Sequence, residues 1–237
     1  MHHITVERWA RQASPLHARD ARAKIIAAVL YLIALGITPP DAWIAMACYT
    51  VLLVTAILIA RLPLRSILLR AALVLPFAAA FAITTWLAGD HLRAWGLVEK
   101  TYLSSAAALV LIATTTLPAL LAGLAAFGAP RALLEVVQFL YRYLFVISEQ
   151  AQHMRLAAAS RGGLSARQGF QAAAGMLGVL FARSYDRANS IYNAMLARGY
   201  NGAIPAAIAP RFTRVDFGFV ALTAALLAAS HVLGAVR

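Results

Sequence analysis

The stretch Ala42–Ala60, AWIAMACYTVLLVTAILIA, decides the fold of this chain, because no charged side chain interrupts it. A helix that crosses the hydrocarbon core of a bilayer needs about 20 consecutive, mostly apolar residues. A helix also satisfies all of its backbone hydrogen bonds internally, which lipid demands of any segment that crosses it. The stretch therefore predicts a transmembrane helix, and with it an all-α integral membrane protein.

The composition of the whole chain supports this prediction. Of its 237 residues, 62% are hydrophobic and 13% are charged, whereas about 25% are charged in soluble domains. The net charge is +12, from 21 Lys and Arg against 9 Asp and Glu. On an apolar background, such an excess indicates a cytoplasmic face next to anionic lipid rather than nucleic acid. We expect membrane lipid as a partner and no nucleic acid.

Four further segments are apolar enough to predict spans, which gives about five transmembrane helices: Ile25–Ile37, Ala71–Ala88, Thr101–Phe127 and Phe217–Val236. The first of these is short, and Arg22 and Lys24 are expected to extend it by reaching toward the interface with their long side chains. Pro76 lies inside the third span and predicts a kink there.

Residues 128–215 differ from the spans because ten arginines are spread along them. Apolar residues still recur at steps of three and four, as in Leu133, Val136, Leu140 and Leu144. This spacing predicts long amphipathic helices rather than bilayer spans. The first is expected to end at Arg161-Gly162-Gly163, Ser165 could cap the second, and the second runs to about Ala197.

The predicted organisation follows from these segments. Residues 1–24 form a cytoplasmic tail, 25–127 the first four spans, 128–215 a cytoplasmic helical region and 216–237 the last span. With the N-terminus in the cytoplasm, all basic residues but Arg93, Lys100 and Arg237 fall inside. Because Lys and Arg collect in cytoplasmic loops, the sequence predicts a multi-pass inner-membrane protein with its N-terminus in the cytoplasm.

The sequence contains no pattern that indicates catalysis. Its histidines are scattered, and no Walker phosphate-binding loop is present. We expect no catalytic residue, no metal ligand and no cofactor, and therefore a protein that is not an enzyme. The predicted spans hold almost no charge, with Glu99 and Asp216 expected at span edges. This argues against an ion-coupled carrier, which places ionisable groups within the membrane.

Two similar segments end the two amphipathic helices: Ala159-Ser160-Arg161-Gly162 and Ala197-Arg198-Gly199. For one copy, helix geometry is explanation enough, since Gly favours the position after a helix end and Arg complements the helix dipole. Two copies on the cytoplasmic face favour a docking role. An Arg at a helix end can pair with a carboxylate of a partner through two parallel hydrogen bonds.

These residues resemble the transmembrane T component of energy-coupling factor transporters, the CbiQ/EcfT family. Two Ala-Arg-Gly signatures close the cytoplasmic coupling helices of that family. Ala197-Arg198-Gly199 looks like the second signature, while the first has Ser160 in place of Ala. The run from Tyr141 through Met154 and the opening Ser14-Pro15-Leu16-His17, followed by Asp20 and Lys24, are also similar to the family.

The resemblance implies a non-catalytic coupling subunit of an ATP-driven importer. Such a subunit links two ABC-type ATPase subunits to a substrate-binding membrane S component. The residues implied in ATPase docking are Ala159, Ser160, Arg161, Gly162, Ala197, Arg198 and Gly199. The region around Tyr141–Gly163 is most similar to the cobalt-type members, which implies cobalt or nickel uptake and a CbiM-like S component.

Three alternatives remain open at this point. The chain could serve a vitamin importer of the same type. It could be a self-sufficient carrier or a membrane enzyme, which would need polar clusters within the spans. Residues 129–215 could also be a basic anchor for anionic lipid, with the two Arg-Gly helix ends incidental.

Overall fold

The computed structural model describes residues 9–10, 14–160, 166–202 and 212–235. Every regular element in these ranges is helical, which confirms the all-α prediction. The chain divides into two compact units: Met1–Phe127 together with Ile208–Arg237 form unit 1, and Gly128–Ala207 form unit 2. Arg161, Gly162 and the predicted cap Ser165 lie outside the described residues, as do Pro205 and Pro210.

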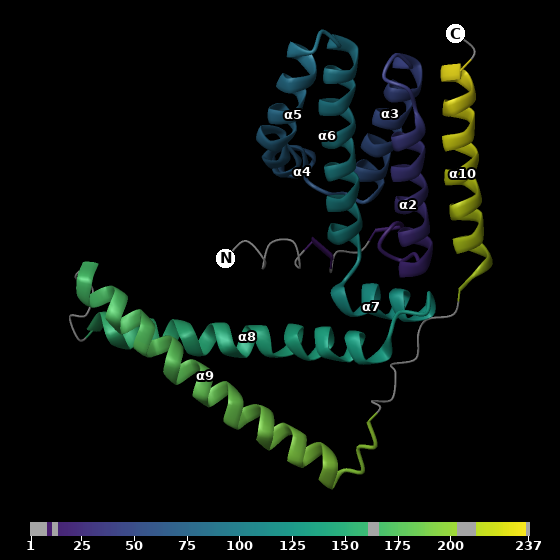
Figure 1. The fold of residues 1–237 in the computed structure, drawn as a ribbon. Helices are drawn as coiled ribbons and strands as arrows, with labels where there is room; N and C mark the ends of the chain where they lie inside the picture. The colour runs from purple at the N-terminus through teal and green to yellow at the C-terminus, as the bar shows by residue number, and fades with distance from the viewer. Residues whose placement is uncertain (1–8, 11–13, 161–165, 203–211, 236–237) are drawn as a thin grey trace. The chain divides into compact units, whose positions relative to one another are not determined.

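Unit 1 is a helical bundle whose long members run side by side (Figure 1). Its elements are α2 (Ala21–Ile37), α3 (Trp43–Ile59), α4 (Leu64–Ala71), the single 3-10 turn η1 (Ala72–Val74), α5 (Leu75–Leu87), α6 (His91–Thr114), α7 (Leu117–Ala126) and α10 (Arg214–Ala235). Its core is centred on the fully buried Tyr49, Leu35, Ile57 and Ile67. The ring of Tyr31 meets the ring of Tyr49 edge-on at 6.0 Å.

The third predicted span begins earlier than expected. The helix starts at Leu64, so Arg65 and Arg70 belong to it rather than to a loop. The α-helical pattern tightens into η1 just before Pro76, which is the second residue of α5. Since proline has no N–H to donate and its ring crowds the carbonyl four residues back, an interruption at this point is expected.

The prediction of one span over Thr101–Phe127 is wrong. Helix α6 begins at His91 and ends at Thr114, and α7 is a separate ten-residue helix. Thr115 has extended backbone angles, and Pro118 is the second residue of α7. Without an N–H, Pro118 cannot continue the hydrogen bonding of α6 to the Thr114 carbonyl. Glu99 consequently lies well inside α6 instead of at a span edge.

Three helical stretches in the described part of the chain are long and apolar enough to cross a membrane by themselves: Leu64–Leu87, His91–Thr114 and Arg214–Gly234. Helix α3 is apolar but has 17 residues, and α2 has the same length with Arg22 and Lys24 in its first turn. Seventeen residues is about the lower limit for a span. The bundle therefore has the make-up of a membrane-spanning unit.

Unit 2 consists of two long helices, α8 (Arg131–Ser160) and α9 (Ala166–Ala197). They diverge from the end at which the chain joins them (Figure 1). The predicted end of the second helix at Ala197 is confirmed, whereas the predicted end of the first at Arg161-Gly162-Gly163 lies outside the described residues. None of the described side chains of α8 or α9 is buried. Unit 2 thus lacks a core of the kind that unit 1 has.

Candidate functional site

The end of α9 is closed by a specific arrangement of backbone hydrogen bonds. The N–H of Gly199 donates to the Leu196 carbonyl at 3.0 Å, and the N–H of Tyr200 donates to the Met195 carbonyl at 3.0 Å. This pair of bonds defines a Schellman motif, in which Arg198 is the C-cap residue. Gly199 has φ of +85°, in the left-handed region that favours glycine. The Arg-Gly order therefore sets how this helix ends.

Arg198 is held by this cap in an exposed position. Arg198 follows the last residue of α9, at the helix end where the dipole favours a positive charge. The cap also turns the chain away directly after Gly199, so that the helix end is accessible. An exposed Arg at a rigid helix end is suited to pair with a carboxylate on another protein.

The end of α8 carries the altered copy of the segment. Ala159 is half-buried and Ser160 is exposed. The Ser160 hydroxyl donates to the Ala157 carbonyl at 2.9 Å. Serine at this position therefore keeps a small side chain and adds a local bond. The neighbouring Arg161 and Gly162 are outside the described residues.

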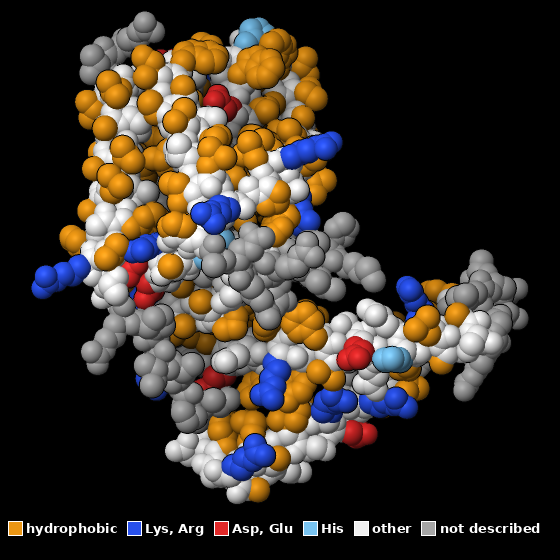
Figure 2. All heavy atoms as spheres, turned by 180° about the vertical axis from the view of Figure 1, so that it is seen from behind, with side chains coloured by type: hydrophobic (Ala, Val, Ile, Leu, Met, Phe, Trp, Pro, Cys, Tyr) orange, Lys and Arg blue, Asp and Glu red, His pale blue; other side chains and the backbone are white. Residues whose placement is uncertain are grey.

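Both helices of unit 2 carry a row of exposed apolar side chains. On α8 the row is Leu133, Val136, Leu140 and Leu144, and on α9 it is Phe170, Leu177, Phe181, Tyr185, Tyr192 and Leu196. We call these two rows the exposed stripes. Figure 2 shows hydrophobic side chains alternating with Lys and Arg on these helices, unlike the more uniformly apolar bundle. Large exposed apolar surfaces rimmed by charge mark sites of interaction with a protein or a membrane.

The charged side chains of α8 and α9 add a basic rim to the stripes. Arg142, Arg155, Arg183 and Arg187 are all exposed. The acidic Glu149 lies 3.8 Å from His153 on the same helix. A basic rim around an apolar stripe suits a partner that presents carboxylates around an apolar groove.

A polar cluster in unit 1 was not found by sequence reasoning. The ammonium of Lys24 donates to the Thr114 carbonyl at 2.8 Å and to the His17 carbonyl at 3.1 Å. The Thr114 carbonyl is the one that Pro118 leaves without a helical partner. Lys24 is only 6% exposed, so the prediction that it reaches to the interface is wrong. Its charge instead compensates the end of α6.

Asp216 fastens the start of α10 to the start of α2. One carboxylate oxygen accepts the backbone N–H of Thr213 at 3.0 Å and also the Thr213 hydroxyl, so Asp216 fixes the residue that precedes α10. The other oxygen accepts the backbone N–H of Asp20 at 3.2 Å. Asp20 in turn caps α2 by accepting the Arg22 N–H at 2.8 Å. Residues separated by almost the whole chain are therefore bonded directly.

The first turn of α2 also supports α7. A Cβ atom on Gly123 of α7 would lie 3.0 Å from Ile25 and 3.5 Å from Ala21, so the two helices approach closely there. The chain leaves unit 1 after α7 and returns to it before α10. Both of these helices contact the start of α2. We call Asp20, Lys24, Thr114, Thr213 and Asp216 the α2 joint. The signal available in the sequence was a Lys and an Asp beside apolar runs, which reads equally well as an interfacial anchor.

Comparison of the sequence with known proteins identifies the family of this chain. A family description of CbiQ, "Cobalt transport protein", matches residues 12–208, which include the opening segment and both helix ends of unit 2. The chain belongs to the CbiQ family. The match stops before Thr213 and Asp216, so it leaves out one side of the α2 joint.

Individual relatives agree with this assignment. The cobalt transport protein CbiQ of Rhodobacter capsulatus is 32% identical over 126 residues, which is 52% of this chain and 52% of that protein. A putative fused cobalt transport protein CbiMQ of Methanocorpusculum labreanum is 29% identical over 126 residues, 21% of its length. An uncharacterised protein of Methanocaldococcus jannaschii is 32% identical over 79 residues, 27% of its length. The chain thus matches about half or less of each relative.

Proposed function

We propose that this CbiQ family member is the membrane coupling subunit of an ATP-driven importer of the energy-coupling factor type, with cobalt, or else nickel, as its substrate. The observation that carries the proposal is the end of α9. There a Schellman cap holds Arg198 exposed, next to the exposed stripe that ends at Leu196. A charged anchor beside an apolar row is suited to docking on a protein rather than to chemistry.

The partners follow from this role. Two ABC-type ATPase subunits receive the ends of α8 and α9, with Arg198 and Arg161 pairing with their acidic groups. A CbiM-like S component binds the substrate in the membrane. The name of the fused Methanocorpusculum relative, CbiMQ, supports such a pairing. The chain lies in the inner membrane with its N-terminus and unit 2 in the cytoplasm, where its many arginines belong.

The α2 joint supports a path from the ATPases to the membrane. Movement of α9 reaches Thr213 through residues 198–213, and movement of α8 reaches α7 through residues 127–130. Both arrive at the first turn of α2, where Asp216 and Lys24 hold α10 and the end of α6. Because these buried hydrogen bonds to charged groups are stronger than neutral ones, the joint moves as one piece and carries the motion into the bundle.

Substitution of Arg198 tests the docking role. We expect Arg198→Glu to weaken copurification of the ATPase subunits by about ten- to a hundred-fold, because a lost and reversed charge leaves the partner carboxylate unpaired. Uptake of radioactive cobalt by cells should fall in parallel. Copurification in mild detergent, followed by mass spectrometry, measures the first effect and identifies the S component.

Arg65→Glu is the matched control, because Arg65 is also exposed but lies on α4 of unit 1, outside the basic rim. It should retain most of the binding. Normal uptake by a chain with both Arg161 and Arg198 replaced would contradict the docking role. Cobalt uptake by the purified chain alone in liposomes would contradict the coupling role and favour a self-sufficient carrier.

A further inference from the structure

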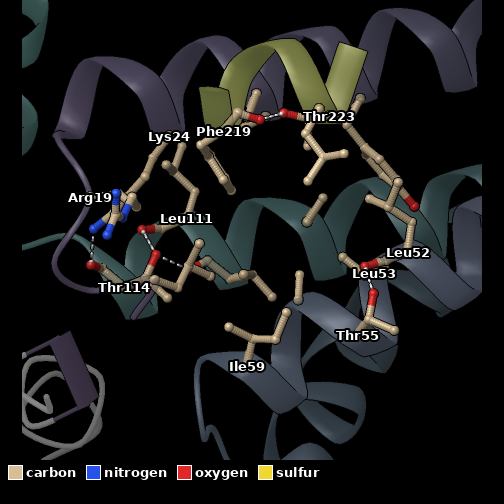
Figure 3. A pocket seen from close by; sticks show the side chains of 18 of the residues that line it. Arg19, Lys24, Leu52, Leu53, Thr55, Ile59, Leu111, Thr114, Phe219 and Thr223 are labelled. Atoms are coloured by element: carbon tan, nitrogen blue, oxygen red, sulfur yellow. Dashed lines mark hydrogen bonds between the residues drawn. The ribbon is translucent and has the colours of Figure 1, made fainter. Parts of the chain in front are cut away.

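Unit 1 contains a hollow of about 560 Å³ between four helices (Figure 3). Small residues on facing sides of the helices leave this space: Ala27 and Ala28 of α2, Ala56 of α3, Ala107 of α6 and Gly218 of α10. A Cβ atom on Gly218 would meet nothing within 4 Å. The volume lies in the range of small-molecule binding cavities, about 300 to 1,000 Å³.

The hollow runs along the helices. Its lining on α10 recurs on one face from Val215 to Leu226, which is about 16 Å at the rise of an α-helix. On α3 and α6 the lining likewise follows one face, from Ile59 to Leu52 and from Thr114 to Ala107. Since α6 and α10 are long and apolar enough to cross a bilayer, the long axis of the hollow follows the direction that lipid chains would take.

The body of the hollow offers apolar contacts only. Its lining is almost entirely aliphatic. The hydroxyl of Thr55 donates to the Leu52 carbonyl at 2.8 Å, and that of Thr223 donates to the Phe219 carbonyl of its own helix. These groups are therefore already bonded and do not require a polar ligand. An occupant of the body must be hydrocarbon.

Two cationic side chains, Arg19 and Lys24, line one end of the hollow, and no acidic side chain in the described part of the chain lines it. Figure 3 shows Arg19 and Lys24 together near Thr114, away from Leu52 and Thr55. The Lys24 ammonium is used by two backbone carbonyls. Arg19 donates its Nε–H to the Pro15 carbonyl at 3.3 Å, and no ion pair between described residues includes it. Its terminal guanidinium N–H groups are thus suited to bind an anion at this end.

The four helices pack against one another in pairs but do not enclose the hollow. Helix α10 packs against α2 and α3, and α6 packs against the same two helices. The hollow between them is open, because its lining residues Ile59, Leu222 and Leu226 are each about half exposed. A flexible hydrocarbon chain can enter from this open side without separating the helices, and the two cations at one end favour an occupant with an anionic head.

We propose that this hollow binds one anionic phospholipid, with an acyl chain between α2, α3, α6 and α10 and its phosphate on the Arg19 guanidinium. The phosphate oxygens accept from the planar fork of Arg19, a pairing that guanidinium geometry favours. The lipid fills space beside the α2 joint, since Lys24 and Thr114 line both. It therefore completes the packing of the bundle at the end from which both connections to unit 2 leave.

The test uses the purified full chain in mild detergent with added phosphatidylglycerol or phosphatidylcholine, followed by delipidation and native mass spectrometry. The wild-type chain should retain one phosphatidylglycerol and little phosphatidylcholine. Arg19→Gln should retain about ten-fold less phosphatidylglycerol, as expected for loss of a charge-assisted hydrogen bond. Arg65→Gln, which removes an exposed arginine that does not line the hollow, should behave as wild type.

A second pair of variants tests the acyl-chain site independently of charge. Gly218→Leu fills the hollow, whereas Gly36→Leu adds the same side chain to a helix glycine that also has nothing within 4 Å but does not line the hollow. Only the first should lose the lipid, by about ten-fold or more. The proposal is overturned if wild type retains no lipid, or if Arg19→Gln and Gly218→Leu both match their controls. Release of the lipid when a substrate-binding subunit associates would also overturn it, since the hollow would then be a seat for that subunit.

Discussion

Unit 1 and unit 2 place their large apolar side chains in different surroundings. In unit 1, Tyr49 and Ile57 have no exposed surface. In unit 2, Leu140 is 63% exposed and Phe181 is 76% exposed, although both lie on helices with many arginines. Apolar residues on the outside of a bundle can face lipid, whereas apolar rows between arginines mark a surface that interacts with a protein or a membrane. The difference indicates that the buried side chains of unit 1 form a core, while the exposed rows of unit 2 form an interaction surface.

Truncation of one apolar side chain in each unit tests this difference and should give the largest effect. Ile57→Ala should lower the free energy of unfolding by about 3 kcal/mol, because it leaves a cavity in a packed core. Phe181→Ala should change it by less than about 0.5 kcal/mol. The midpoint of thermal unfolding in detergent measures both. Equal destabilisation by the two variants would mean that Phe181 is packed within the chain.

The same pair gives a second readout. Phe181→Ala should weaken copurification of the ATPase subunits by about ten-fold, the effect of removing an aromatic residue from an interface. Ile57→Ala, assayed below its unfolding temperature, should bind them as wild type does. If Phe181→Ala leaves binding unchanged, the exposed stripe of α9 is not the docking surface.

Acidic residues provide the next contrast. Asp216→Ala should destabilise unit 1 by about 2 to 3 kcal/mol, because the buried N–H of Asp20 and the N–H of Thr213 lose their acceptor. Asp186→Ala on α9 is the matched control, since Asp186 is exposed, and it should be close to neutral. Thermal unfolding measures both variants. A neutral Asp216→Ala would show that the α2 joint does not hold α10 to α2.

Helix glycines give the smallest effect, with opposite signs in the two units. A Cβ atom on Gly96 of α6 would lie 2.9 Å from Cβ of Pro40, whereas one on Gly175 of α9 would meet nothing within 4 Å. Gly96→Ala should destabilise by about 1 kcal/mol through overpacking. Gly175→Ala should stabilise α9 by about 0.5 to 1 kcal/mol through helix propensity. Hydrogen exchange of the amides of α6 and α9 reports each change, and stabilisation at both positions would contradict close packing at Gly96.

The helices of unit 2 were predicted more accurately than the spans. The end of α9 at Ala197 is confirmed, since an Arg-Gly pair after a regular apolar period is a local signal. The span over Thr101–Phe127 is wrong, because hydropathy alone does not register that Pro118 stops one helix and starts another. Apolar content reports transfer into lipid, and it says little about where hydrogen bonding along the helix is broken.

Some residues of the candidate site could be predicted from the sequence, and others could not. Ser160, Ala197, Arg198 and Gly199 could be selected from the sequence because their pattern is contiguous. The α2 joint could not, because Lys24 and Thr114 are far apart in the chain, as are Asp20 and Asp216. Nothing in the sequence around Lys24 distinguishes a lysine bonded to backbone carbonyls from one that anchors a helix at the interface.

The sequence by itself determined that this chain is helical and made for a membrane, that a basic pair of amphipathic helices ends in Arg-Gly segments, and that it resembles one transport family. Those properties depend on residues close together in the chain. Only the tertiary structure decided that Lys24 is buried, that Asp216 bonds to Asp20 and that four helices line a hollow with Arg19 at its end. These depend on which helix faces meet, and that is settled by packing among residues far apart in the sequence.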